Sequence, residues 1–450
     1  MTSLSTPPSH IGVEPDRSAP RRIRPLVDFL HAEASAGVLL VLAAFIALAW
    51  ANSPWWSGYF ELWGTDISVS IGSQELSLTL RDWINDLAMV LFFFVAGLEI
   101  KREVTQGELR DPKQAALPVI AAVGGMIAPA VIFAMLNAGG SGSRGWGIPM
   151  ATDIAIVAGV VALLGRRVPS WLKLFLLALA IADDIGAIVV IAIFYSNGVS
   201  LPWLAAAVST VVVAYLMRSR VPFIGVYLAL GALCWWSLHE AHISTTLTGV
   251  AFGLLAPVTP RRDPTLVDAA ELGELLELED IQAASRLSRH AQESVSVVEW
   301  LEFRLHPWSA FVVVPVFALA NAGIRVPTGE FGHIMSQPVT WGVILGLVLG
   351  KPIGITIATL LAVRLRVGRL PDSVTKRYVV GAGALAGIGF TVSLFVTDLA
   401  FGESIHADEA KLGVLVASLT AALIGSAICL PGIVHEPAGS GQGGPTGQTD

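Results

Sequence analysis

Apolar runs long enough to cross a lipid bilayer recur along almost the whole chain. A hydrocarbon layer of about 30 Å requires about 20 helical residues at about 1.5 Å per residue. Hydrophobic residues make up 54% of the 450 residues, charged residues only 14%, and the mean hydropathy is +0.68. The sequence therefore predicts an all-α polytopic membrane protein with about twelve transmembrane helices. Their expected centres lie near Leu42, Phe92, Gly125, Val157, Asp183, Val211, Leu230, Gly249, Val314, Leu347, Gly387 and Leu419.

Basic residues in the connections predict the orientation of these helices. Lys and Arg accumulate on the cytoplasmic side of membrane proteins. Here basic connections alternate with connections that hold few such residues, for instance SNGVSLP, which holds none. An even number of spans with both termini in the cytoplasm fits this alternation. The basic connections contain Arg17 to Arg24, Lys101 to Lys113, Arg166 to Lys173, Arg218 and Arg220, Arg261 and Arg262, and Arg364 to Arg377.

A single membrane domain is expected over residues 29–432. It is preceded by a cytoplasmic tail (1–28) without a cleavable signal and followed by a low-complexity cytoplasmic tail (433–450) that we expect to be disordered. An enlarged acidic loop at about 259–305 is expected on the cytoplasmic side. The two cysteines fall in apolar runs, which favours packing roles over a disulfide or a metal site.

One outside connection differs from the others, because DISVSIGSQELSLTL alternates apolar and polar residues around Gly72-Ser73. This alternation predicts a small extracytoplasmic β-hairpin over about residues 66–81. Its free edges make it a candidate homodimer contact, and the alternative is a hairpin folded down onto its own chain. The apolar residues expected to face each other are Ile67, Val69 and Ile71 on one strand and Leu76, Leu78 and Leu80 on the other.

Four charged residues lie deep inside the predicted spans: Asp153, the adjacent pair Asp183 and Asp184 in AIADDIG, and Lys351. Each costs at least about 2.5 to 3.5 kcal/mol at the centre of a membrane helix, so each is a functional candidate by default. Asp183 is about ten residues, or roughly 15 Å, from either end of its run, which places it near the bilayer midplane.

The chemistry of these four residues suits protons and small hard cations. Burial and a second carboxylate favour proton binding, and carboxylate oxygens are ligands for ions such as Na⁺ or Li⁺. Adjacent helical residues project about 100° apart, so Asp183 and Asp184 can flank one cavity. An alternative is that the acids only neutralise Lys351 and hold the helices together, although one base cannot neutralise three acids. For Lys351, the roles of salt-bridge partner, proton carrier or both remain open.

Two spans are predicted to be broken. The run around Asp153 contains Gly147, Pro149 and Thr152, and the other run is glycine-rich from Gly381 to Gly389. Unwound backbone at membrane depth occurs where protein or a water-filled cavity satisfies it, and it often binds ions. The breaks fall in the middle of two three-span groups, the third to fifth and the tenth to twelfth, which predicts inverted repeats. For the second break, ordinary packing of small residues is the alternative.

These motifs together resemble NhaA-type sodium/proton antiporters, over residues from about Phe29 to Leu430. The resemblance rests on WINDLAMVLFFFVAGLEIKREVTQGEL, PVIAAVGGMIAPA, ATDIAIVAGVVALLGRRVP, ALAIADDIGAIVVIAIFY, LHPW, ALANAG, GKPIGI and GIGFTVSLFV.

The resemblance implies roles for the deep residues. Asp184 would be a direct cation ligand, and Asp183 a proton-exchanging partner paired with Lys351. Thr152 and Asp153 would belong to the crossing of the two broken helices, where Asp153 compensates the positive helix ends and Lys351 the negative ones.

A cytoplasmic cluster tied to pH response is also implied by the resemblance; from the residues alone, GLEIKRE reads as a basic anchor at the membrane edge. Two positions depart from the family pattern, where Ser244, and Phe303 or Arg304, stand at sites that are His in some members. Asp86, in INDLA, is expected to cap the start of a helix. The members of the cluster are Glu99, Lys101, Arg102, Glu103 and Glu302.

The resemblance predicts a secondary Na⁺(Li⁺)/H⁺ antiporter of the bacterial cytoplasmic membrane that exports sodium as protons enter. We expect electrogenic, pH-regulated exchange of two protons per sodium, with both aspartates of AIADDIG giving up protons, no cofactor and no nucleic-acid partner. The alternative is a cation or proton channel that uses the same carboxylates. An enzyme is not expected, because the nine His residues lie in loops, tails or span ends and neither HExxH nor GxSxG occurs.

Overall fold

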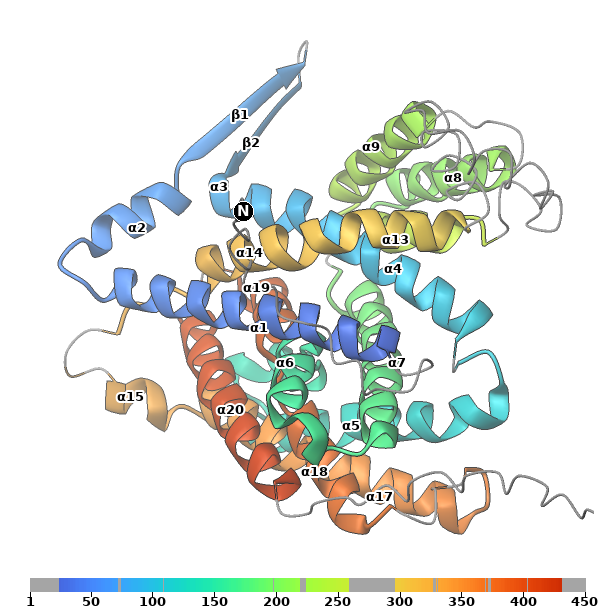
Figure 1. Ribbon diagram of the computed structural model, residues 1–450. Coiled ribbons are helices and arrows are strands. Elements are labelled where there is room, and N and C mark those ends of the chain that lie inside the picture. Colours follow the sequence, from blue (N-terminus) through green and yellow to red (C-terminus); the bar gives the residue numbers. More distant parts are fainter. Residues whose placement is uncertain are drawn as a thin grey trace, which may run out of the picture.

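A computed structural model describes most of the chain (Figure 1). It covers residues 24–71, 74–107, 109–196, 198–218, 224–258, 296–326, 329, 331–368, 370, 374–402 and 404–430. Most of the N-terminal tail, most of the acidic loop at 259–305 and almost all of the C-terminal tail lie outside these described residues.

Helices form most of the described chain. The first half contains α1 (Arg24–Ala51), α2 (Trp56–Trp63), α3 (Leu80–Trp83), η1 (Ile84–Ala88), α4 (Met89–Gln106), α5 (Pro112–Leu136), η2 (Ser141–Met150), α6 (Ile154–Leu164), η3 (Gly165–Arg167), α7 (Ser170–Phe194), α8 (Leu201–Met217), α9 (Ile224–Glu240) and α10 (Leu247–Leu255). The second half contains α13 (Val297–Trp308), η5 (Ser309–Val313), α14 (Val314–Asn321), α15 (Phe331–Ser336), α16 (Pro338–Leu345), η6 (Gly346–Gly350), α17 (Lys351–Arg364), α18 (Lys376–Ala386), α19 (Phe390–Phe401) and α20 (Ile405–Cys429).

Seven helical stretches of the described chain are long and apolar enough to cross a membrane, so the chain is a multi-pass membrane protein. They are Ala34–Ala51, Leu80–Gln106, Pro112–Leu136, Ser170–Phe194, Val297–Asn321, Pro338–Arg364 and Ile405–Cys429. Two bent pairs raise the number to nine. The three remaining predicted centres fall in α8, α9 and α10, which have 17, 17 and 9 residues. The count of twelve therefore stays a prediction, as does the inverted repeat.

The two predicted breaks are confirmed. The axes of η2 and α6 are bent by 43° at residues 151–153, and those of α18 and α19 by 47° at residues 387–389. Pro149 and the glycines of GAGALAGIG explain the positions of these breaks, because neither residue type favours a continuous α-helix.

Strands β1 (Asp66–Ile71) and β2 (Gln74–Thr79) pair in an antiparallel ladder in which Ile67 faces Leu78 and Val69 faces Leu76. Leu80 was expected in the second strand, but α3 begins at this residue. Ile71 pairs with Gln74. The ladder projects away from the helices (Figure 1), so the alternative of a hairpin folded down onto its own chain is not what the structure has.

The start of the second span corrects the expected role of Asp86. Thr79 caps α3, and Asp82 completes a capping box with it. Asp86 instead lies inside the π-helical turn η1, where its carboxylate accepts a 3.3 Å hydrogen bond from the Thr245 hydroxyl. The prediction of a cap at Asp86 is therefore wrong.

Small residues bring the helices that carry the deep charges into close contact. α5 packs along α17, and a Cβ atom added at Gly124 would lie 2.5 Å from the carbonyl oxygen of Gly354. A Cβ atom at Gly125 would lie 2.8 Å from Cγ1 of Ile355. Such close approach of backbones is typical of helix packing in membranes, and it places the first residue of α17, Lys351, in the interior.

Candidate functional site

The two helix breaks meet through Asp153. Its main-chain N–H donates a 2.7 Å hydrogen bond to the carbonyl oxygen of Ile388, in the other break. Its carboxylate caps α6 by accepting from the N–H of Ile156 at 3.1 Å. The same carboxylate accepts from the N–H of Thr391 at 3.0 Å and from the Thr391 hydroxyl at 2.6 Å. Asp153 thus lies at the amino ends of both α6 and α19, where helix dipoles favour negative charge.

Thr152 links this crossing to the charged residues of two other helices. Its hydroxyl lies 2.6 Å from Oδ2 of Asp183, 2.9 Å from the carbonyl oxygen of Ala386, and 2.8 Å from Nζ of Lys351. Since a hydroxyl has one proton, Thr152 accepts from Lys351 and donates to one of the two oxygens. The Ala386 carbonyl ends α18, so the hydroxyl connects a helix carboxyl end to the buried pair.

Asp183 and Lys351 form a fully buried ion pair. Nζ of Lys351 donates to Oδ2 of Asp183. Lys351 is 0% exposed and Asp183 is 1% exposed. The other carboxylate oxygen, Oδ1 of Asp183, is buried and has no hydrogen-bond partner among the described residues. A buried oxygen with free lone pairs is available to a cation.

Asp184 is the next residue of α7 but has a different environment. It is partly exposed, and among the described residues it makes no hydrogen bond. The carboxyl groups of Asp183, Glu99 and Asp153 are near enough to act on it electrostatically. The structure thus gathers all five predicted site residues, Thr152, Asp153, Asp183, Asp184 and Lys351, around the crossing.

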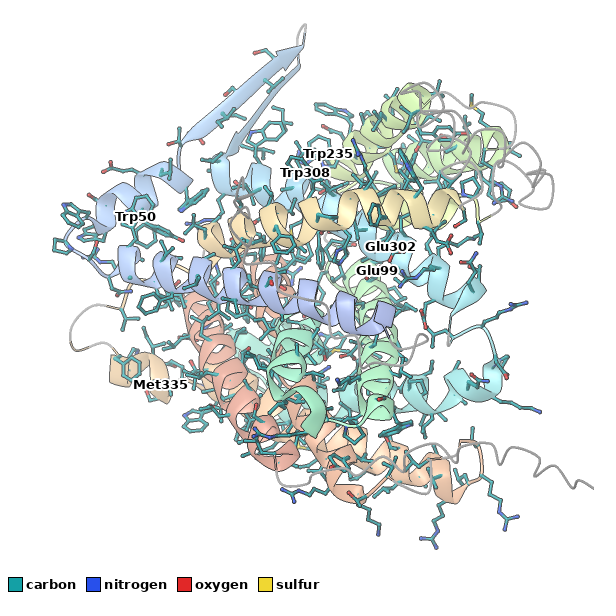
Figure 2. The ribbon with its side chains drawn as sticks, in the orientation of Figure 1. Trp50, Glu99, Trp235, Glu302, Trp308 and Met335 are labelled. Atoms are coloured by element: carbon teal, nitrogen blue, oxygen red, sulfur yellow. The ribbon has the colours of Figure 1, made fainter. Side chains whose placement is uncertain are left out.

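The predicted pH-response residues lie on α4 and α13, which pack together. Figure 2 labels Glu99 on α4 and Glu302 on α13 near the place where these helices cross. Nη1 of Arg102 donates to Oε1 of Glu302, and a carboxylate oxygen of Glu99 is 3.9 Å from Nε2 of His306. Glu103 is buried, and Lys101 lies half-buried on the same helix.

The positions at which the sequence departs from the family pattern, Ser244 and Phe303, take no part in these contacts. Phe303 is 83% exposed, and the hydroxyl of Ser244 lies 2.7 Å from the hydroxyl of Thr246.

Comparison with known proteins decides the family. The profile of the family described as Na+/H+ antiporter 1 matches residues 27–429. The chain belongs to the NhaA-type Na⁺/H⁺ antiporter family. This confirms the resemblance seen in the sequence, and the family is one of transporters, not of enzymes.

Curated NhaA antiporters align over most of the chain. Na(+)/H(+) antiporter NhaA 2 of Sorangium cellulosum is 44% identical, with 93% of this chain and 92% of that protein covered. Na(+)/H(+) antiporter NhaA of Rhodopirellula baltica is also 44% identical, with 91% and 94% covered. The NhaA antiporter of Helicobacter pylori (strain P12) is 42% identical, with 89% and 94% covered.

A solved structure shares the fold. The sodium proton antiporter MjNhaP1 of Methanocaldococcus jannaschii at pH 8 superimposes with a TM-score of 0.50 at 12% identity. The match covers 91% of this chain and 96% of that chain.

This NhaA-type chain also contains a partly buried polar network that was not predicted from the sequence. Nζ of Lys411, on α20, is 2.8 Å from Oδ1 of Asp398, on α19. Asn85 donates to Asp398 at 3.3 Å, and Asn321 donates to Asn85 at 2.7 Å. Asp398 and Lys411 are near the ends of apolar runs, where a charged residue is weak evidence of function. Their contact in the structure is what identifies them as a pair.

Proposed function

We propose that this chain is a secondary antiporter that exports Na⁺ or Li⁺ in exchange for external protons. The buried Asp183–Lys351 pair beside Asp184, at the crossing of two broken helices, carries this proposal. The names of the relatives, Na⁺/H⁺ antiporters that align over about nine-tenths of the chain, support Na⁺ and H⁺ as the exchanged ions.

In the proposed cycle, Asp184 binds the cation. Asp183 binds and releases a proton, and its ion pair with Lys351 forms and breaks as it does so. Asp184 is suited to the cation because it is the more exposed of the two acids and has no hydrogen bond to give up among the described residues. Oδ1 of Asp183, which has no hydrogen-bond partner among the described residues, provides a second carboxylate oxygen on α7. Asp153 and Thr152 hold the crossing in place.

Two protons leave when one monovalent cation enters: one from Asp184, and one from the Asp183–Lys351 pair. Exchange of two positive charges for one moves a net charge in each cycle. The membrane potential then contributes about 2.3 kcal/mol per 100 mV. Lys351 has two roles in this scheme: it is the salt-bridge partner of Asp183, and it shares with Asp183 the proton that the pair releases.

Regulation by pH is assigned to the α4–α13 cluster of Glu99, Lys101, Arg102, Glu103 and Glu302. Glu99 supports this assignment because it acts electrostatically on Asp184 and also lies beside His306. Protonation in the cluster changes the charge felt at the ion site. No cofactor takes part, since Na⁺, Li⁺ and H⁺ are the cargo.

The chain is proposed to lie in the bacterial cytoplasmic membrane with both termini inside, and to form a homodimer through β1 and β2. The exposed apolar residues of the ladder, Ile67 and Val69, support a protein contact there. Deletion of residues 66–79 should convert a dimer to a monomer in analytical ultracentrifugation. An unchanged dimer would assign the contact to another surface.

Everted membrane vesicles test the antiport directly. Addition of Na⁺ or Li⁺ should collapse a preformed proton gradient, K⁺ should not, and Asp184→Asn should abolish the response. Asp66→Asn is the matched control, because it removes the same charge from an exposed strand residue. Ion flow without counter-exchange, measured as Na⁺ current with no proton movement, would point to a channel instead.

The stoichiometry requires its own measurement. In proteoliposomes, the exchange rate should respond to an imposed potassium diffusion potential. A rate independent of voltage would reject two protons per sodium and leave antiport itself in place.

A further inference from the structure

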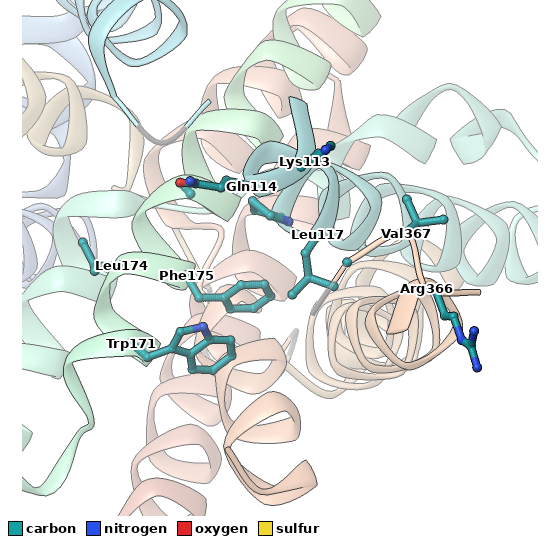
Figure 3. Close-up of a pocket in the computed structure, with 11 residues that line it drawn as sticks. Lys113, Gln114, Leu117, Trp171, Leu174, Phe175, Arg366 and Val367 are labelled. Carbon is teal, nitrogen blue, oxygen red and sulfur yellow. The ribbon is translucent and has the colours of Figure 1, made fainter. Parts of the chain in front are cut away.

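A cavity of about 730 Å³ lies where the ends of three helices meet, away from the ion site (Figure 3). The ends are the start of α5, the start of α7 and the turn after α17. Its wall includes the polar side chain of Gln114 and an apolar part formed by Leu117 and the rings of Trp171 and Phe175, which stack at 5.0 Å between centroids. Figure 3 shows Leu117 facing these rings.

Two bases, Lys113 and Arg366, stand at the margin of this cavity. Both are exposed, and the guanidinium of Arg366 extends away from the rings in Figure 3. No acidic residue lines the cavity among the described residues. Asp111, two residues before Lys113, caps α5 by accepting from the N–H of Lys113 at 3.0 Å. The cavity therefore combines an apolar part of its wall with a positively charged rim.

The backbone conformation of Arg366 is an independent indication. The N–H of Val367 donates to the carbonyl of Ala362 at 3.0 Å, and that of Arg366 donates to the carbonyl of Val363 at 3.1 Å. These two bonds form a Schellman motif, in which the residue at the position of Arg366 is usually glycine. Arg366 instead adopts φ +60°, a left-handed conformation that costs a residue with a Cβ atom backbone energy. Strain of this kind points to a role for the side chain.

We propose that this cavity binds an anionic phospholipid of the leaflet on that side of the membrane. Its phosphate would contact Lys113 and Arg366, and its acyl chains would lie against Trp171 and Phe175. The basic residues at these helix ends predict that the cavity lies on the cytoplasmic side of the membrane. Anionic lipid headgroups on that side bind in basic pockets between helices. Leu174 and Val367, which are 39% and 48% exposed, continue the apolar part of the wall toward the lipid. The bound lipid joins α7, which carries Asp183 and Asp184, to α17, which carries Lys351.

Arg366→Gly gives a sharp test, because glycine suits the left-handed turn and the variant loses the cationic side chain without straining the backbone. The full-length variant in detergent is incubated with phosphatidylglycerol, and the bound lipid is counted by native mass spectrometry. We expect about five-fold weaker binding than for the wild type, as for loss of one base near an anionic surface. Arg366→Lys should retain binding, and Lys113→Gln should lower it as well.

Three comparisons identify the ligand. Phosphatidylcholine with the same acyl chains should bind weakly to every variant. Inorganic phosphate at millimolar concentration should not displace phosphatidylglycerol, because it lacks the acyl chains; displacement would assign the cavity to a free anion. Arg218→Gln, which removes a base at the far end of α8, should leave binding unchanged. Equal binding of phosphatidylglycerol to the wild type and to a variant with both Arg366→Gly and Lys113→Gln would overturn the proposal.

Discussion

The amide nitrogen of Asp153 lies 2.7 Å from the carbonyl oxygen of Ile388, so the two broken helices are joined through their own backbones. In lipid, each unpaired backbone group costs several kcal/mol. Here the unwound residues of one break satisfy those of the other, and the Asp153 carboxylate does the same for the amide of Thr391. The crossing is therefore a self-consistent structure that positions Thr152 beside Asp183 and Lys351.

Replacement of Thr391 by valine should destabilise the crossing. The variant keeps the shape of the side chain but removes the hydroxyl that donates to Asp153 at 2.6 Å. Loss of a buried hydrogen bond to a charged group costs about 1 to 3 kcal/mol. We expect a lower thermal midpoint for the purified protein, measured by tryptophan fluorescence. Thr391→Ser, which keeps the hydroxyl, is the control, and equal midpoints for the two variants would contradict the prediction.

Replacement of Lys351 by methionine should destabilise the protein more strongly. Removal of one partner leaves the Asp183 carboxylate buried without its base, which costs about 3 to 5 kcal/mol. The combined variant Asp183→Asn, Lys351→Met should recover most of that stability, because no uncompensated charge remains. A double-mutant cycle on thermal midpoints measures this coupling. Additive losses in the double variant would show that the two residues do not act as a pair.

Removal of Arg102 should change both stability and the pH profile. Arg102→Met leaves Glu302, which is 6% exposed, without the cation that it contacts. Loss of a hydrogen bond to a charged group predicts a cost of about 1 to 3 kcal/mol. If the cluster tunes exchange, the pH of half-maximal Na⁺-dependent proton flux should also move, by about half a unit or more. Arg304→Met, which removes an exposed base of α13, the helix that carries Glu302, should change neither quantity.

Tyr59 should make the stability of the protein fall at alkaline pH. Burial raises the pKa of Tyr59 from 10.0 to about 12. Its hydroxyl, 2.8 Å from the carbonyl of Leu319, also accepts from the N–H of Gly323 at 3.1 Å. A raised pKa in the folded state gives stability that is fully present below pH 10 and is lost between about pH 10 and 12, at about 1.4 kcal/mol per pH unit.

The comparison of wild type with Tyr59→Phe isolates this effect. The wild type should have the higher thermal midpoint at pH 8, and the difference should shrink between about pH 10 and 12. A difference that stays constant across this range would show that Tyr59 ionises equally easily in both states.

Much of the architecture could be predicted from the sequence because hydropathy is a local property. An apolar run of about 20 residues is long enough to cross the bilayer as a helix, and Gly381 to Gly389 with Pro149 marked the two breaks. Charges in the middle of such runs identified Asp153, Asp183, Asp184 and Lys351 as the site candidates, because lipid makes each of them costly.

Features set by packing could not be predicted in this way. Asp398 and Lys411, near the ends of apolar runs, were not singled out in the sequence, and the structure places Oδ1 of Asp398 2.8 Å from Nζ of Lys411. Asp86 looked like a cap, yet Thr79 and Asp82 provide it. The left-handed conformation of Arg366 carries no sequence signal, because glycine would be expected at that position.

The two aspartates of AIADDIG show the division most clearly. The sequence by itself determined that two carboxylates lie near the middle of one membrane helix, because the length and polarity of the run are written in consecutive residues. The spacing of the residues left open which aspartate meets Lys351; the resemblance implied Asp183, and the tertiary structure shows that Asp183, not Asp184, contacts Lys351. That choice depends on the rotation of α7 relative to α17, which is fixed by the packing of helices far apart in the chain.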